Sequence, residues 1–165
     1  MKRKEKTSKQ ILSNENDDLC YWITVANSKG RDTFDDGELK RPVAVHHLVH
    51  KTKTAMIWEL DDLFPMKQGN HFRIHRGGEE GFFVSKIIRE KGQDWYDTLH
   101  FRGTQPYKMN LDKVFLVNRR LRYIFRQITK MGYDEFRQCS EPKDDKDYYR
   151  WNIIYGLWRK KEVKE

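Results

Sequence analysis

The residues of this chain that could carry out chemistry are its histidines. Five of the six histidines fall between residues 46 and 75. His46 and His47 are adjacent, whereas His71 and His75 are four residues apart, a spacing that puts both imidazoles on one face of a helix. Two such histidines and one from a neighbouring strand would give a divalent metal ion three nitrogen ligands and leave positions open for water or a phosphate oxygen. The spacing therefore indicates a catalytic metal site rather than a closed structural one.

The chain around these histidines predicts the elements that must position them. Residues 42–49 are rich in valine with alternating side chains, which favours a strand. Residues 68–76 contain no glycine or proline after Gly69 and fit one helical segment. Gly77 and Gly78 would end that helix.

The adjacent histidine pair sets a geometric condition. Successive residues of a strand point to opposite faces of the sheet. His46 and His47 can therefore serve one site only if the strand twists or bulges there, or if a phosphate lies between them. His50, three residues further on, is an additional candidate ligand or base.

Three stretches follow one another in an order typical of a known nuclease family. They are Val43-Ala44-Val45-His46-His47, Leu60-Asp61-Asp62-Leu63 and Asn70-His71-Phe72-Arg73-Ile74-His75-Arg76-Gly77. His46 and His71 are 25 residues apart, and His47 and Asp62 are 15 apart. This order resembles that of the HNH, or ββα-metal, nucleases, and most closely the DNase domains of the colicin type. The resemblance covers residues 41–77.

The resemblance implies a role for each matching residue. The ligands of one divalent ion, Mg²⁺ or a transition metal such as Zn²⁺ or Ni²⁺, would be His46, His71 and His75. His47 would be the general base that activates the attacking water. Asp62 stands where the family usually has an asparagine that bridges the loop between the strands and orients the base, although a carboxylate cannot donate as an amide does. Arg41 would stabilise the charged phosphorane, and hydrolysis would leave a 5′-phosphate and a 3′-hydroxyl.

Two other metal sites are alternatives. A structural zinc site could use the same histidines, but such sites usually include cysteine, and Cys20 and Cys139 are far from them in the sequence. The acidic pairs 35–36 and 61–62 could form a carboxylate site. We interpret them instead as solvated loop acids, because no predicted element brings them together.

The positive charge of the chain is concentrated in its last third. The formal net charge is +8, and residues 101–165 hold 16 basic against 9 acidic side chains, whereas residues 1–100 hold 17 against 16. A polyanion such as DNA or RNA suits this distribution. The basic side chains that we expect to bind nucleic acid are Arg76, Arg119, Arg122, Arg126 and Lys130. For the last four, a solvated helix face is an equally weighted alternative.

Strands are predicted in two further places. Residues 19–25 are rich in β-branched and aromatic side chains and favour a strand. Residues 81–89 and 95–101, joined by a short polar segment, resemble a β-hairpin.

Two helices are predicted in the C-terminal third. Apolar side chains recur at helical spacing over residues 111–131, and Gly132 follows where a C-cap belongs. A second helix is predicted over residues 147–161 from four aromatic residues at spacings of 3, 4 and 3: Tyr148, Trp151, Tyr155 and Trp158. We expect this aromatic stripe to pack against the first helix, with base stacking as the alternative.

These patterns predict an α+β protein with a mixed strand and hairpin core. That core would contain a ββα-metal motif and precede a basic helical C-terminal part. The expected organisation is a flexible charged arm over residues 1–18, the core over 19–104 and the helical region, packed on the core, over 105–165. The length of 165 residues suits about one domain.

The expected function is that of a metal-dependent endonuclease acting on DNA, or alternatively RNA, with low sequence specificity. A protein inhibitor is a further candidate partner. The main alternative is a non-catalytic nucleic-acid-binding or host-interaction protein that uses the basic C-terminal helix, and a small barrel-type reader module is a third. The chain has no apolar run of membrane-spanning length and no secretory signal, so we expect a cytoplasmic protein with no membrane partner.

Overall fold

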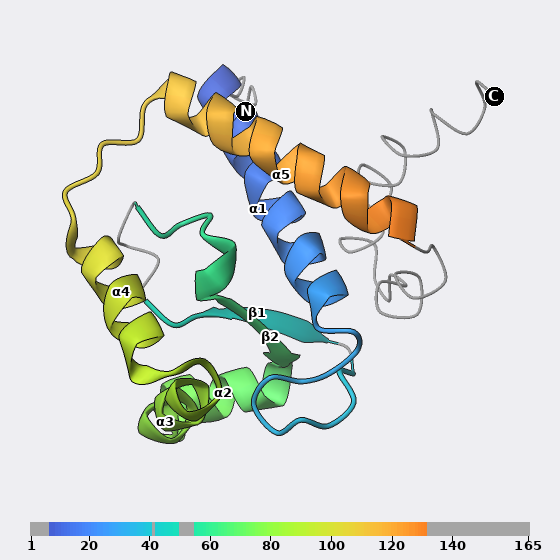
Figure 1. Ribbon diagram of the computed structural model, residues 1–165. Helices are drawn as coiled ribbons and strands as arrows, with labels where there is room; N and C mark the ends of the chain where they lie inside the picture. Colours follow the sequence, from blue (N-terminus) through green and yellow to red (C-terminus); the bar gives the residue numbers. More distant parts are fainter. Residues whose placement is uncertain (1–6, 41, 50–54, 132–165) are drawn as a thin grey trace, which may run out of the picture. The chain divides into compact units, whose positions relative to one another are not determined.

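The computed structural model describes residues 7–40, 42–49 and 55–131 of the protein. Within these residues the protein is α+β and mostly helical, with a two-stranded antiparallel sheet (Figure 1). The elements in chain order are α1 (Ser8–Asn27), β1 (Val43–His47), the 3-10 turn η1 (Leu60–Asp62), β2 (Leu63–Lys67), α2 (Gln68–Arg76), α3 (Glu80–Lys91), α4 (Gln93–Thr104) and α5 (Leu111–Met131). The chain divides into a central unit, residues 24–108, and a helical unit, whose described residues are 7–23 and 109–131. No helix of the described residues is both long enough and apolar enough to cross a membrane.

The sheet of the central unit leads directly into α2. β1 and β2 pair in an uninterrupted antiparallel register from Val43 opposite Lys67 to His47 opposite Leu63. β2 is buried over its first four residues, as expected for a strand with apolar neighbours on both faces. The N–H of Gln68, the first residue of α2, donates to the carbonyl of Pro42 just before β1. The end of β2 and the start of α2 are thereby fixed to the start of β1.

Helices and loop residues together supply the rest of the central core. Phe83 and Ile87 of α3 are fully buried, one helical turn apart, and Leu99 of α4 joins the same cluster. The Phe83 ring packs edge-on against Phe64 of β2. Gly103 allows α4 to approach closely, because a Cβ there would lie 2.6 Å from a methyl carbon of Val49.

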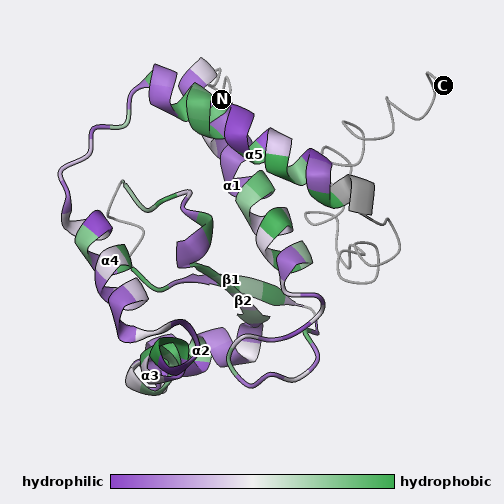
Figure 2. Ribbon diagram, in the orientation of Figure 1, coloured by the Kyte–Doolittle hydropathy of each residue, from purple (hydrophilic) through white to green (hydrophobic). Residues whose placement is uncertain are grey.

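In the helical unit, α1 and α5 bury apolar side chains and are also joined by polar contacts. Both helices alternate hydrophobic and hydrophilic residues (Figure 2). The buried Asn118 amide donates to Asn16 Oδ1 at 2.9 Å, and Asn16 donates to the carbonyl of Val114 at 3.3 Å. Arg122 donates twice to the Glu15 carboxylate, at 2.7 and 2.8 Å. These paired groups fix which turns of the two helices meet, because a slip would leave buried amides without partners.

Several predicted elements are confirmed. The strand predicted over 42–49 is β1, and the helix predicted over 68–76 is α2. Gly77 follows α2 as its C-cap residue. The helix predicted over 111–131 is α5. The helix predicted over 147–161 lies outside the described residues.

The other strand predictions are wrong. Residues 19–25 belong to α1, and the hairpin predicted over 81–101 is the helix pair α3 and α4. Both segments contain short runs of β-branched and aromatic side chains. Such short apolar runs do not distinguish a strand from a buried helix. Gly92, at φ 96°, makes the turn between α3 and α4, a conformation that glycine adopts readily.

The predicted N-terminal arm is also wrong over residues 8–18, which are helical. The Gln10 N–H donates to Thr7 Oγ1, and the Thr7 N–H donates to Gln10 Oε1. This reciprocal pair is a capping box that starts α1. The two units meet in the sequence at residues 23–24 and 108–109, rather than at the expected boundaries after 18 and 104.

Candidate metal centre

Three histidines from β1 and α2 converge in the central unit. The ring of His46 lies 5.6 Å from that of His71 and 5.0 Å from that of His75, measured between centroids. The rings of His71 and His75 are 4.5 Å apart. One donor nitrogen from each residue lies within 4.8 Å of the other two. The three histidines are therefore close enough to bind one metal ion.

The local fold explains this convergence. His46 is buried on β1 and rests edge-on against Phe83 of α3, with ring centroids 5.3 Å apart. α2 starts directly after β2 and buries Ile74, so its position relative to the sheet is fixed. His71 and His75 are one turn apart on this helix, with their Nε2 atoms 3.2 Å apart. His46 is buried, His71 is half-buried and His75 is exposed, so solvent reaches the cluster on the His75 side.

The electrostatics of the cluster favour the metal-binding form of His71. Burial, and secondarily the neighbouring His75, lower the pKa of the His71 imidazole. Both causes disfavour the charged form. A neutral imidazole is the form that coordinates a metal.

The fourth histidine of the motif, His47, faces a different partner. Its Nδ1 lies 3.2 Å from Oδ2 of Asp62, whose side chain is fully buried. Oδ1 of the same carboxylate accepts the N–H of Val49 at 2.5 Å. Burial raises the pKa of the Asp62 carboxyl, although the hydrogen bonds from His47 and Val49 act in the opposite direction. When Nδ1 carries the proton donated to Asp62, Nε2 is the basic nitrogen of the ring.

The strand reaches this arrangement without a bulge. The register of β1 is regular through His47, and the two neighbouring imidazoles contact different groups. His46 lies against α2, and His47 lies against Asp62 at the end of η1. The regular register therefore excludes a bulge at the histidine pair.

The remaining predicted site residues differ in exposure and in their partners, and some lie outside the described residues. Arg76 is exposed near the end of α2, with Cζ 5.4 Å from the centroid of the Phe72 ring. Arg119 and Arg126 are exposed on α5 of the helical unit. Arg122 is engaged by Glu15, and this ion pair raises the pKa of its guanidinium. Arg41, His50 and the Lys130 side chain lie outside the described residues.

A buried carboxylate that was not among the predicted site residues holds the start of α2. Asp32 is fully buried, and its Oδ2 accepts the N–H of Lys67, the N-cap residue of α2, at 2.7 Å. The same oxygen accepts the Asn70 amide at 3.0 Å, and Oδ1 accepts the N–H of Phe34 at 2.8 Å. Asp32 thus caps a helix whose N-cap residue lies 35 residues later in the chain. No local pattern in the sequence signals a contact of this length.

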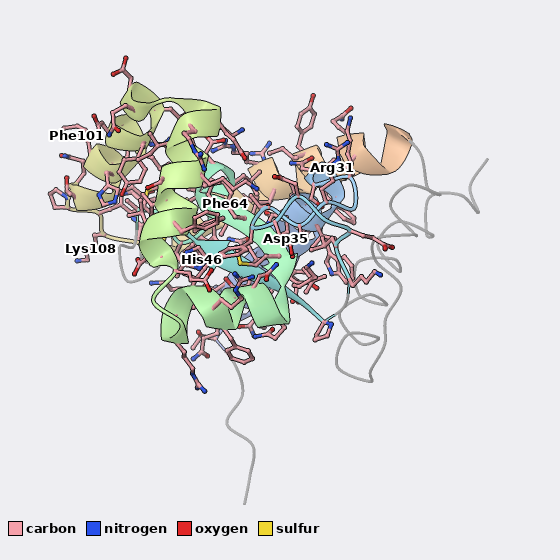
Figure 3. All side chains as sticks on the ribbon, turned by 90° about the horizontal axis from the view of Figure 1, so that it is seen from below. Arg31, Asp35, His46, Phe64, Phe101 and Lys108 are labelled. Atoms are coloured by element: carbon pink, nitrogen blue, oxygen red, sulfur yellow. The ribbon has the colours of Figure 1, made fainter. Side chains whose placement is uncertain are left out.

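Asp35 adds a second carboxylate to the same support. Figure 3 shows Asp35 and His46, both beside α2. Asp35 Oδ2 accepts Lys67 Nζ at 2.7 Å and the Asn70 amide at 3.0 Å. Partial burial raises the pKa of Asp35, but hydrogen bonds from Lys67, Asn70 and the Gly37 N–H outweigh it and lower this pKa to about 2. The prediction of Asp35 as a solvated loop acid is therefore wrong, because its carboxylate binds the start of α2.

Comparison with known proteins finds no match, whether with protein-family models, with curated proteins or with solved structures.

Proposed function

We propose that this protein is a metal-dependent endonuclease of the HNH, or ββα-metal, type that hydrolyses phosphodiester bonds of DNA. The observation that carries the proposal is the approach of three histidine nitrogens to within 4.8 Å of one another, next in sequence to a histidine tethered to a buried carboxylate. In this proposal β1, β2 and α2 are the two strands and the helix of the motif.

The donor set indicates which metal the site would hold. Three imidazoles form the cluster, and among the described residues no carboxylate joins it. Nitrogen donors suit Zn²⁺ or Ni²⁺, whereas Mg²⁺ prefers oxygen ligands. With three protein ligands, a tetrahedral ion keeps one position for water or substrate. When bound, such an ion polarises the phosphoryl oxygen and neutralises charge on the leaving oxygen.

His47 would act as the general base. Its Nδ1 is directed to Asp62, which leaves Nε2 to take a proton from the attacking water. Imidazole can accept that proton near neutral pH. We propose that the scissile phosphate lies between His46 and His47. One side of the phosphate would then face the metal-binding histidines, and the opposite side would face the base, His47. No base-reading group belongs to this set of residues, which agrees with low sequence specificity.

The proposal is tested with supercoiled plasmid and the purified protein. We expect nicking with Zn²⁺ or Ni²⁺ and none after a chelator is added. His47→Ala should bind the metal and DNA as the wild type does, but nick at least about 100-fold more slowly, the usual contribution of a general base. His100→Ala is the matched control, because His100 is exposed on α4 and does not belong to the histidine cluster.

Two outcomes would contradict the proposal. If the wild type nicks DNA with none of the divalent ions, the protein is not this kind of nuclease. If it shifts DNA in a gel and His47→Ala shifts it equally, with no cleavage by either, a non-catalytic nucleic-acid-binding role is supported instead. Exposed Arg119 and Arg126 of α5 would then be the first residues to replace.

A further inference from the structure

An aromatic side chain stands exposed beside the metal-binding histidines. Phe72 directly follows His71 on α2, and 48% of its surface is exposed. The other large apolar residue of this helix, Ile74, is 2% exposed and anchors α2 in the core. Packing of α2 therefore does not require a phenyl ring at position 72. Single exposed apolar residues are common, and the neighbours of Phe72 distinguish it from them.

Phe72 is paired with a cation that keeps its charge available. Arg76 lies one helical turn further on, with Cζ 5.4 Å from the centroid of the Phe72 ring. The other arginine of α2, Arg73, donates to both oxygens of Glu79, at 2.9 and 2.7 Å. Arg76 has no such acidic partner among the described residues. Of the two guanidinium groups on this helix, Arg76 is thus the one without a paired carboxylate among the described residues.

The helix places this pair next to the metal centre. Residues 71 and 75 form one row along α2, and residues 72 and 76 form the neighbouring row. A phosphodiester held at the three histidines would bring its adjoining nucleotide to the second row. Arg76 can bind a phosphate through its planar fork, and a phenyl ring offers a face for stacking but no hydrogen bonds.

A phenyl ring can stack on a nucleobase only when that base is not stacked between its neighbouring bases. In a duplex both faces of a base are covered by neighbouring bases, whereas a single strand can splay its bases onto aromatic side chains. Such stacking tolerates any base, because every base has a π-face. The pair therefore suits an unpaired nucleotide of any sequence.

We infer that Phe72 and Arg76 form a subsite for an unpaired nucleotide beside the scissile phosphate, and that single-stranded or locally unwound DNA is the preferred substrate. This inference rests on the proposed nuclease function. Phe72 supplies the stacking surface, and Arg76 binds the adjoining phosphate.

The test compares Phe72→Leu with the wild type on one labelled oligonucleotide, offered single-stranded and as a duplex. With Zn²⁺ present, we expect the wild type to cleave the single strand faster than the duplex. Phe72→Leu should bind and cleave the single strand about tenfold or more weakly, as the loss of one stacked base predicts. Its cleavage of the duplex should fall much less than its cleavage of the single strand, and its Zn²⁺ affinity should stay unchanged. Phe101→Leu is the matched control, because Phe101 is an exposed phenylalanine of α4, 65% exposed.

Binding of the single strand is measured separately by fluorescence anisotropy, so that the two proposals can fail independently. If the wild type cleaves neither substrate, the nuclease function fails, and the subsite is decided by whether Phe72→Leu weakens single-strand binding. Equal cleavage of single strand and duplex by the wild type would overturn the inference and leave the nuclease function intact. The same holds if Phe72→Leu matches the wild type, or weakens both substrates equally.

Discussion

At the scale of single residues, the Asp62 carboxylate accepts two donors at once. It binds His47 through one oxygen and the Val49 N–H through the other. An amide has one acceptor oxygen and one donor nitrogen, so Asp62→Asn can keep only one of these contacts in the same form. If the amide turns its nitrogen to His47, it favours the tautomer that carries the proton on Nε2, and that tautomer cannot act as the base.

We therefore expect Asp62→Asn to fold and bind Zn²⁺ but to nick plasmid at least about tenfold more slowly at neutral pH. A much larger loss follows in hydrolases whose catalytic histidine is held in the wrong tautomer. Nicking rates and Zn²⁺ titrations of both proteins check this. Asp61→Asn, at the exposed neighbouring acid, is the control. A wild-type rate for Asp62→Asn would show that the carboxylate does not orient the base.

A second residue-scale prediction concerns acid stability. The pKa of Asp35 is about 2 in the folded protein, below its ordinary value of 3.8. A lowered carboxyl pKa stabilises the fold at pH values above 3.8, and this stabilisation is lost as the pH falls toward 2. The side chain is 36% exposed, so solvent screens part of the effect.

We expect Asp35→Asn to lower the Tm of the central unit by roughly 2–5 °C near neutral pH. The difference from the wild type should shrink as the pH falls and vanish near the pKa of about 2. Thermal unfolding of both proteins along a pH series provides the measurement. A difference that stays constant over the whole series would mean that the charge of Asp35 contributes nothing.

At the scale of elements, α2 is a short helix whose start is capped from a distant loop. Its N-cap residue, Lys67, has no side-chain cap of its own, and Asp32 accepts the Lys67 N–H instead. Asp32→Ala would leave this N–H and that of Phe34 without their acceptor. Unsatisfied buried donors cost about 1–3 kcal/mol each. We therefore expect Asp32→Ala to lower the free energy of unfolding by roughly 2–4 kcal/mol.

Zn²⁺ affinity should fall with the Asp32→Ala change, by about tenfold, because fraying of the first turn of α2 moves His71 relative to His46. Urea unfolding and calorimetric Zn²⁺ titration measure the two effects. Glu38→Ala serves as the control, since Glu38 lies in the same loop with 75% of its side chain exposed. Equal Zn²⁺ affinities for the two variants would show that the cap stabilises α2 without positioning its histidines.

The elements around the histidines were predictable because their signals are local. The valine-rich strand before His46, the histidine spacing of four and Gly77 all lie within a few residues of the elements they define. The start of α1 carries an equally local signal, the Thr7 and Gln10 capping box, although the prediction placed these residues in a flexible arm. The two buried carboxylates of the site, Asp62 and Asp32, were not predictable in this way. Asp62 contacts His47, 15 residues away in the sequence, and Asp32 contacts Lys67, 35 residues away.

The helices α3 and α4 show where residue type misleads. Phe82, Phe83 and Val84 favour a strand by composition, yet Phe83 and Ile87 are both fully buried one turn apart. In a helix, residues 83 and 87 lie on one face and Ser85 lies on another. In a strand, Ser85 would lie on the same face as Phe83 and Ile87 and would enter the core with them. Tertiary packing decided the conformation here, and composition alone could not.

At the scale of the whole molecule, all three proposed metal ligands belong to the central unit. The helical unit is held by its own contacts, among them Asn16 with Asn118 and Glu15 with Arg122. A ligand that binds the folded state stabilises the structure that forms its site, by about 2.7 kcal/mol at 100 times its Kd. Whether that stabilisation reaches the second unit depends on whether the two units unfold together.

We expect the two units to respond separately. Saturating Zn²⁺ should slow amide hydrogen exchange in β1, α2 and α3 by up to about 100-fold where exchange requires unfolding of the central unit. Exchange in α5 should stay unchanged. Peptide-resolved hydrogen exchange, with and without Zn²⁺, gives the comparison, and His71→Ala is the control that should remove the protection. Equal protection of α5 would show instead that the two units unfold as one cooperative structure.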